Sequence, residues 1–162
     1  MLTSLGKIVG LPAVWQDRQL GLVERAIPNA ATRRLSGVII RRGIGHARWA
    51  PADEIALVGE RCVLLLRKPE HLPDNRGGAL TRAFLTTGEC VGEVTDVLLH
   101  GDTLRLAALE VSSGPLYRLM GRHAYAADFR VLSQGRRAGE VIVPQLMTWA
   151  ELERRMGEEG EG

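Results

Sequence analysis

The pattern of apolar and polar positions over residues 20–43 occurs a second time over residues 91–114. An offset of 71 residues, which sets Gly21 against Gly92, gives six identities in 23 ungapped positions. The other five identical pairs are Val23 and Val94, Thr32 and Thr103, Arg34 and Arg105, Leu35 and Leu106, and Gly43 and Gly114. A period of about 70 residues is too long for a solenoid repeat, so we interpret the chain as two copies of one small domain.

Each copy begins with the pattern of a β-hairpin. A β-rich run opens at Gly21 and again at Gly92, and a polar turn and a second strand-like run follow in both copies. In the second run the alternation of apolar positions slips by one residue, across Ser36–Gly37 and across Ala107–Ala108. A one-residue slip turns every following side chain to the other face of the sheet. The slip therefore predicts a β-bulge or a strand break at both places.

The two copies diverge after the hairpin and then become similar again. Trp49–Ala50 aligns with Tyr125–Ala126, and we expect both aromatic side chains in a core. Each copy then continues with an acidic residue, a β-branched residue, a Gly-containing turn and a closing apolar strand. The second copy carries an insertion at residues 115–121, where we expect the copies to differ most in structure.

This order of strands and turns resembles the PRC-barrel family, which is named after the cytoplasmic barrel of the photosynthetic reaction centre H subunit. Residues 6–14 are also similar to the usual start of bacterial stand-alone members. The resemblance covers nearly all of residues 6–68 and 80–145. It implies an all-β fold of two small tandem β-barrels, and it supplies no catalytic residues. Family members commonly have an Asp at the position of Asp96, where the first copy has Arg25.

The domain organisation that we predict has four parts. Residues 1–68 form the first PRC-barrel-like domain, and residues 69–79, which are rich in Pro and Gly, form a linker. Residues 80–146 form the second PRC-barrel-like domain, and residues 147–162 form a short helix and an acidic tail. Domains this small bury only about 60% of their unfolded surface, so we expect the two barrels to pack together.

The C-terminal segment has the pattern of a capped helix. Thr148 and Glu151 form a capping box, and apolar residues recur from Trp149 to Met156 at helical spacing. We expect a helix from Trp149 to about Met156 that ends at Gly157, followed by a disordered tail.

The positive charge is concentrated in the first predicted barrel. Residues 1–68 carry eleven Lys and Arg against five Asp and Glu, whereas residues 80–146 carry seven of each. Five arginines lie around the first hairpin and are the candidate partner-binding residues: Arg33, Arg34, Arg41, Arg42 and Arg48. Arginine forks bind phosphates and carboxylates, although a plain solvated strand face would carry the same residues. No aromatic residue interleaves with these arginines, which disfavours the binding of single-stranded nucleic acid.

Other function classes lack the residues that they require. The four histidines have no metal-ligand spacing, and no Ser, His and acidic residue form a catalytic pattern, so we expect no metal, cofactor, small-molecule substrate or enzymatic activity. No run of apolar residues could span a membrane and no secretory signal is present, so we expect a cytoplasmic protein. Cys62 and Cys90 fit a reducing compartment, and the sequence leaves open whether they meet.

Two functional hypotheses remain. The first is a non-enzymatic adaptor that binds another protein through its barrel faces, as the resemblance implies. The alternative is an RNA- or ribosome-associated assembly factor that uses the basic face of the first barrel, since a ribosome maturation factor ends in a PRC barrel. The identity of the partner and the oligomeric state stay open.

Overall fold

The computed structural model describes residues 1–74, 79–113, 123–132 and 137–160. The chain is mostly β and has two sheets, one of which curls into a half-barrel, and a C-terminal helix. It divides into two compact units. The first comprises Met1–Ala79 and Val97–Ala107, and the second comprises Leu80–Asp96 and Ala108–Gly162.

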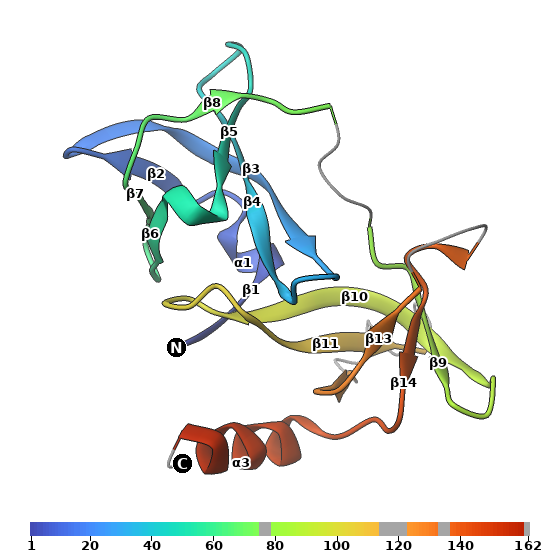
Figure 1. Cartoon of the computed structure of the whole chain (residues 1–162). Coiled ribbons are helices and arrows are strands. Elements are labelled where there is room, and N and C mark those ends of the chain that lie inside the picture. Colours follow the sequence, from blue (N-terminus) through green and yellow to red (C-terminus); the bar gives the residue numbers. More distant parts are fainter. Residues whose placement is uncertain (75–78, 114–122, 133–136, 161–162) are drawn as a thin grey trace. The chain divides into compact units, whose positions relative to one another are not determined.

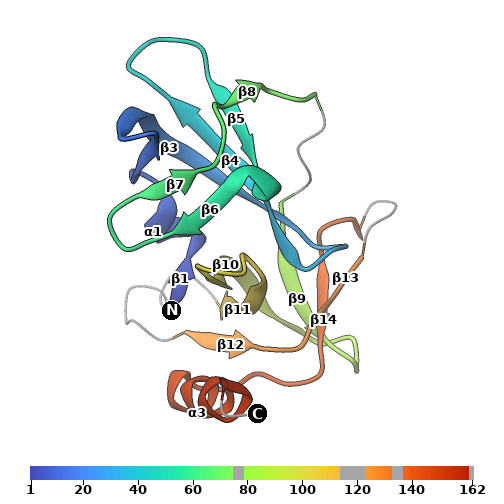
Figure 2. The ribbon, with the colours of Figure 1, turned by 60° about the vertical axis from the view of Figure 1, so that its left-hand side comes forward.

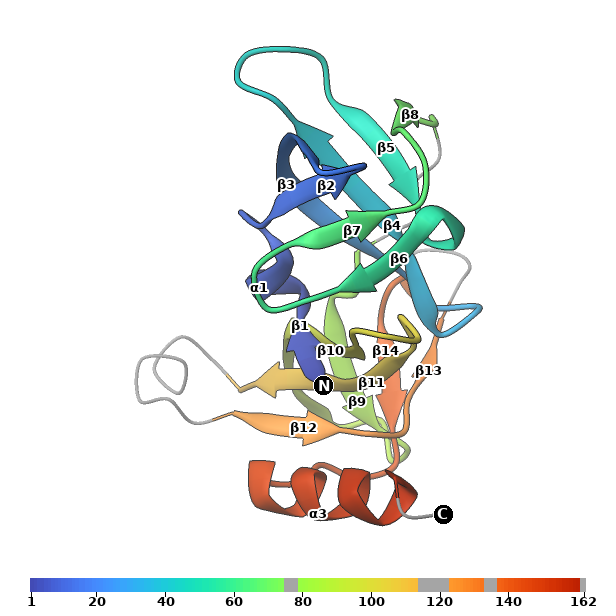
Figure 3. The ribbon, with the colours of Figure 1, turned by 90° about the vertical axis from the view of Figure 1, so that its left-hand side faces the viewer.

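The first unit holds a seven-stranded sheet in the order β6-β7-β2-β3-β4-β5-β8 (Figure 1, Figure 3). Its elements are β1 (Leu2–Ser4), α1 (Leu5–Ile8), β2 (Pro12–Trp15), β3 (Arg18–Asn29), β4 (Arg34–Arg41), β5 (Arg48–Pro51), the 3-10 helix η1 (Ala52–Glu54), β6 (Ile55–Val58), β7 (Val63–Leu65) and β8 (Glu70–His71). The strand β1 lies outside this sheet and pairs with β10.

The second unit contains the elements β9 (Arg82–Leu85), β10 (Cys90–His100), β11 (Leu106–Ser112), β12 (Ala124–Ala126), β13 (Arg130–Val131), β14 (Val141–Val143) and α3 (Trp149–Gly160), although β10 and β11 extend beyond it. Its strands follow the order β13-β14-β9-β10-β11-β12, which repeats the order β6-β7-β2-β3-β4-β5 of the first sheet. In both sheets the strand of this set that comes first in the chain pairs in parallel with the strand that comes last. These pairs are β2 with β7 and β9 with β14. The topology therefore repeats together with the sequence pattern.

The strand irregularities repeat as well. In β3, Leu20 has no partner on β2, because the neighbouring pairs are Ala13 with Gly21 and Val14 with Gln19. In β10, Val91 has no partner on β9, because the neighbouring pairs are Ala83 with Gly92 and Phe84 with Cys90. Leu20 and Val91 are 71 residues apart, so both copies carry a β-bulge at the same position.

The predicted bulge of the first hairpin is confirmed. Ile27 pairs with Gly37, whereas Pro28 pairs with Leu35, so Ser36 is the extra residue of β4. The matching bulge at Ala107–Ala108 stays a prediction. The insertion expected at residues 115–121 lies outside the described residues.

The core of the first unit includes residues from the second copy of the repeat. Ile8 of α1 is fully buried and packs with inward residues of β2 to β7. Leu99 and Leu104, at the tip of the β10–β11 hairpin, are buried in the same core with 0% and 2% exposure. The predicted second domain, residues 80–146, is thus divided between the two units, because its hairpin tip buries its leucines in the first.

Part of the predicted linker belongs to the first sheet. Glu70–His71 form β8 and pair with β5, and Leu72 packs against a small cluster on the outward face of the sheet. That cluster contains Trp49, which is 6% exposed, so the expected burial of this ring is confirmed. Tyr125, its counterpart in the second copy, is only half-buried.

The capping box of α3 is confirmed. The amide of Thr148 donates to Glu151 Oε2 at 3.1 Å, and the amide of Glu151 donates to Thr148 Oγ1 at 3.3 Å. Leu152 is fully buried, and the Trp149 ring lies edge-on to Tyr125 of β12, beside which the helix runs (Figure 2). Within the described residues, no helix is long and apolar enough to cross a membrane.

The predicted end of this helix is wrong, because α3 continues through Gly157 to Gly160. A glycine inside a helix costs only about 1 kcal/mol relative to alanine, which neighbouring interactions can offset. Arg155 pairs with Glu159 one turn later, with 3.6 Å between Nε and Oε1, and this pair supports the last turn.

Candidate functional site

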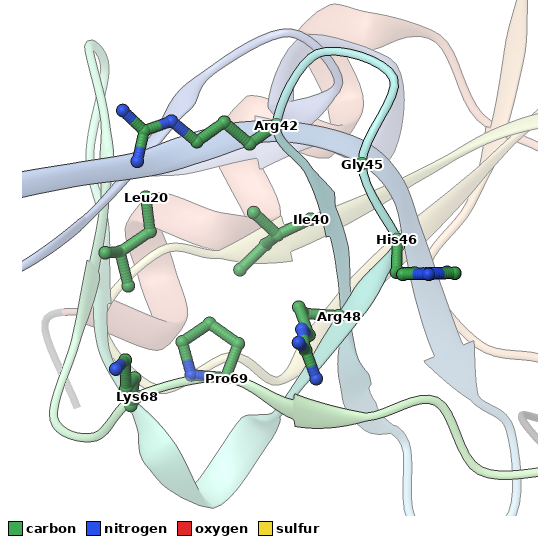
Figure 4. A pocket seen from close by; sticks show the side chains of 8 residues that line it. All are labelled: Leu20, Ile40, Arg42, Gly45, His46, Arg48, Lys68 and Pro69. Carbon is green, nitrogen blue, oxygen red and sulfur yellow. The ribbon is translucent and has the colours of Figure 1, made fainter.

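A basic hollow of about 380 Å³ opens on the first unit between the β4–β5 turn and the chain that follows β7 (Figure 4). Its lining residues are Leu20, Ile40, Arg42, Gly45, His46, Arg48, Lys68 and Pro69. Leu20, Ile40 and Pro69 provide apolar walls, and the cationic side chains surround them. The hollow therefore offers both positive charge and apolar surface to a ligand.

Strand pairing brings Arg48 to this hollow. Arg48 lies directly opposite Ile40 on β4, and paired residues project from the same face of a sheet. On its other side Arg48 pairs with His71 of β8, whose Nδ1 lies 3.3 Å from Arg48 Nη1. Arg42 follows directly after β4, and Lys68 precedes β8, so the ends of three strands supply the cations.

A second hollow of about 550 Å³ adjoins the first one. It shares Leu20, Arg42 and Lys68 with the first hollow and adds Trp15, Arg18 and Gln19. We call the two hollows together the basic trough. The basic trough has Arg18 in one hollow, Arg48 in the other, and Leu20 in the wall that both share.

The bulge in β3 explains the position of Leu20. A bulged residue has no partner across the strand pair, and its side chain is turned away from the regular alternation. Leu20 is half-buried, so part of its side chain packs on the core and part faces the trough. The same local irregularity thus builds the apolar centre of the site.

The cations of the basic trough have no acidic partner in the described part of the chain. No carboxylate of residues 1–74, 79–113, 123–132 or 137–160 forms an ion pair with Arg18, Arg42, Arg48 or Lys68. Arginine forks that lack an internal carboxylate are available to an external one.

Arg41 has a different role from its neighbour Arg42. Its Nε and Nη2 bind the two carboxylate oxygens of Glu24 at 3.0 and 3.3 Å, and its Nη1 donates to the carbonyl of Gly45 at 2.9 Å. Three of its five N–H groups therefore bond to β3 and the β4–β5 turn, and the side chain stays 42% exposed. Arg41 thus braces the rim of the hollow and is not among the residues that line it.

Arg33 and Arg34 lie at the opposite end of β4. The eight residues of this strand separate Arg34 from Arg41 by roughly 23 Å at about 3.3 Å per residue. Arg34 Nη2 donates to the carbonyl of Thr103 at 3.4 Å, in the tip of the β10–β11 hairpin. Of the five predicted arginines, the structure brings only Arg42 and Arg48 together in the hollow.

Three residues of the basic trough were not predicted from the sequence: Trp15, Arg18 and Lys68. The parallel pairing of β2 with β7 brings the chain after β7 close to the β2–β3 turn, and no short-range pattern in the sequence marks that pairing. Trp15 lines the second hollow beside Arg18, so an aromatic ring does accompany the arginines. Of the five predicted arginines, only Arg42 lines a hollow together with this ring.

The second unit contains a buried carboxylate between two arginines. Glu140, whose side chain is 8% exposed, accepts from Arg137 Nε at 2.8 Å and from Arg82 Nη2 at 3.1 Å. The hydrogen bond from Arg137 is the main cause that lowers the pKa of Glu140, and Arg82 adds to it. Both guanidinium groups also lie over the Phe84 ring. These bonds join the three side chains in a structural clamp, in which two arginines share one carboxylate.

A second polar group comprises Thr95 of β10, Glu110 of β11 and His123, which directly precedes β12. Thr95 Oγ1 donates to Glu110 Oε1 at 2.7 Å, and His123 Nδ1 lies 3.4 Å from the same oxygen. The carboxylate of Glu110 is thus the common neighbour of the Thr95 hydroxyl and the His123 ring. Burial, followed by the charges of Glu110 and Asp96, raises the pKa of the neighbouring Tyr125.

Metal-binding clusters and a disulfide do not occur among the residues that the structure describes. No group of three His, Cys, Asp or Glu side chains there could hold a metal ion. Cys62 and Cys90 are both free thiols. No protein-family model matches the chain, and no curated protein sequence matches it.

Proposed function

We propose that this chain is a non-enzymatic interaction module that binds an acidic segment of another protein in the basic trough of its first unit. The observation that supports this proposal is the set of cations, Arg42, Arg48 and Lys68, which have apolar walls beside them and no carboxylate partner in the described chain. Carboxylate side chains would fill the bonding directions of the arginines, and neighbouring apolar side chains would cover Leu20 and Pro69.

The finer assignment of the fold is part of the same proposal. We interpret both halves as PRC-barrel-like domains, and the repeated strand order and the repeated bulges at Leu20 and Val91 support their common origin. Members of the family that the sequence resembles act as adaptor barrels on larger assemblies. An adaptor role in the cytoplasm is the function that follows from this resemblance.

RNA binding is the second candidate function, and Trp15 favours it. An aromatic ring beside arginines can stack on a base while the guanidinium groups bind phosphates. Trp15 is half-buried and lines the second hollow together with Arg18 and Arg42. We rank this function second because Trp15 also packs on the core of the first unit, which leaves less of its ring for a base.

A binding titration with a charge-matched control tests the proposal. Fluorescent glutamate-rich peptide and fluorescent structured RNA are titrated with the full-length protein at about 50 and 200 mM salt. The variant Arg42→Gln/Arg48→Gln removes two charges from the trough, and the control Arg33→Gln/Arg34→Gln removes two charges at the far end of β4. We expect the first variant to lose peptide binding and the control to keep it.

Three outcomes contradict this function. Equal losses in the two variants would show that net charge, and not the trough, binds the peptide. Absence of peptide binding at both salt concentrations would reject the acidic partner. Tight RNA binding with a log–log salt slope of about 0.9 for each neutralised phosphate, lost in Arg42→Gln/Arg48→Gln, would establish the second candidate instead.

A further inference from the structure

The arrangement of the basic trough specifies more than an acidic partner. Its two hollows share Leu20, Arg42 and Lys68, but only one contains Arg18 and only the other contains Arg48. The trough therefore has Arg18 at one end and Arg48 at the other. Leu20 lies between them, with Arg42 and Lys68 beside it. A ligand that complements this order carries negative charge at both ends and an apolar group between them.

The strand register sets the distance between the two terminal cations. Arg48 lies opposite Ile40, and Ile40 lies opposite Val23 of β3, which is five residues from Arg18. With about 4.8 Å between strands and about 3.3 Å per residue, the Cα atoms of Arg18 and Arg48 are roughly 19 Å apart along a flat sheet. Curling of the sheet and the inward reach of both side chains shorten the gap that a ligand must cover.

An extended peptide fits this distance better than a helix. Residues i, i+2 and i+4 of an extended chain lie on one face, and they span roughly 13 Å. The same four residue steps along a helix rise only about 6 Å, and residue i+2 of a helix points away from residues i and i+4. For a segment of five residues, only the extended form therefore places three side chains on the trough at once.

On the basis of the proposed function, we infer that the basic trough recognises an extended protein segment with acidic residues at positions i and i+4 and an apolar residue at position i+2. The acidic side chains bind the cations of the two hollows, and the apolar side chain packs on Leu20. The bulge that exposes Leu20 is therefore a determinant of specificity. Without it the trough would lose the apolar residue that both hollows share.

Three fluorescent peptides of closely matched charge test this inference with the full-length protein. The first has the order Glu-Ser-Leu-Ser-Glu, the second moves the leucine to give Glu-Leu-Ser-Ser-Glu, and the third replaces it to give Glu-Ser-Ser-Ser-Glu. We expect the first peptide to bind about tenfold more tightly than the other two, since its leucine alone faces Leu20. In the variant Leu20→Ala this preference shrinks to about twofold or less, with a melting curve as the control for folding.

A second arm tests the two ends. Each glutamate of the first peptide is replaced by glutamine in turn, and both peptides are measured against the protein and its Arg18→Gln variant. We expect Arg18→Gln to lower the affinity for the first peptide. One of the two singly substituted peptides has lost the glutamate that binds Arg18, and for that peptide Arg18→Gln should not lower the affinity further.

The outcomes separate this inference from the proposed function. Equal binding of the three leucine and serine peptides would overturn the recognition pattern while the acidic-segment function stands. An effect of Arg18→Gln on both singly substituted peptides would overturn the assignment of the two ends. Failure of all peptides to bind would overturn the proposed function itself.

Discussion

Arg34 and Arg105, which the 71-residue offset sets against each other, face one another across an isolated antiparallel bridge. The bridge is closed by two backbone hydrogen bonds, Leu35 N to Leu104 O at 2.8 Å and Leu106 N to Arg33 O at 2.9 Å. Each bond is the counterpart of the other under the same offset. Equivalent residues of the two hairpin tips thus form both bonds of this bridge.

The residues beside this bridge share an unusual backbone conformation. Arg33 and Leu104 both lie in the left-handed region, with φ of 53° and 61°. A residue with a side chain pays of order 1 kcal/mol or more in this region, whereas glycine adopts it freely. The hairpin tips of both copies therefore keep a strained turn that lets them pair.

Arg33→Gly should test this strain, because Arg33 is exposed and its side chain can be removed without opening the core. Relief of the strain offsets the extra freedom of glycine in the unfolded chain, so we expect a change between neutral and about 1 kcal/mol stabilising. The matched control is Arg34→Gly in β4, where glycine should destabilise by about 0.5–1 kcal/mol. Urea unfolding measures both. A clear loss of stability in Arg33→Gly would contradict the argument.

The glycines that open the two hairpins are predicted to be irreplaceable. Gly21 and Gly92 have φ of 149° and 145°, and each lies against a carbonyl oxygen twenty residues later, that of Arg41 and that of Ser112. A Cβ on Gly21 would lie 2.7 Å from the oxygen of Arg41. We expect Gly21→Ala and Gly92→Ala each to reduce the unfolding free energy by about 2 kcal/mol or more.

The control for these two variants is Gly157→Ala. Gly157 lies inside α3, and no atom would meet an added Cβ there. Alanine should stabilise this helix by about 1 kcal/mol. Thermal melting of the three variants therefore has two expected signs, and a mild effect at Gly21 or Gly92 would show that the hairpin openings tolerate side chains.

The hairpin tip at residues 97–107 should stabilise the first unit and not the second. Leu99 is fully buried in the core of the first unit, so Leu99→Ala should cost about 2–5 kcal/mol. Hydrogen exchange should then speed up in β3 and β4. Leu109→Ala, which removes a fully buried side chain of the second unit, should speed up exchange in β11 and β12 first. The same exchange pattern in both variants would contradict the division into two units.

The fold could be predicted from the sequence where the interactions are local. The slip of the apolar pattern at Ser36–Gly37 and the capping box at Thr148 are short-range signals, and both are confirmed. The bulge at Leu20 could not be predicted in this way, because Gly21 interrupts the alternation of apolar and polar residues at that point. Packing of Leu99 in the first core depends on a contact between distant parts of the chain, which the apolar pattern alone does not encode.

The candidate site could be predicted only in part. Arg42 and Arg48 lie close in sequence and are brought together by one turn, so counting charges located them. The same count added Arg33 and Arg34, because it takes no account of the length of β4. Lys68 and Arg18 join the site through the pairing of β2 with β7, which links distant segments.

The clamp at Glu140 should make stability depend on acid pH. The pKa of Glu140 is lowered in the folded state, so its contribution is fully present above the ordinary pKa of 4.5 and is lost as the pH falls through the folded value. Unfolding free energies of the protein and of Glu140→Gln, measured between pH 3 and pH 7, should therefore converge toward the acid end. Arg137→Gln removes the main cause of the lowered pKa and should shrink the difference that Glu140→Gln makes at pH 7. A gap between the protein and Glu140→Gln that stays constant over this range would show that the carboxylate of Glu140 titrates alike in the folded and unfolded chain.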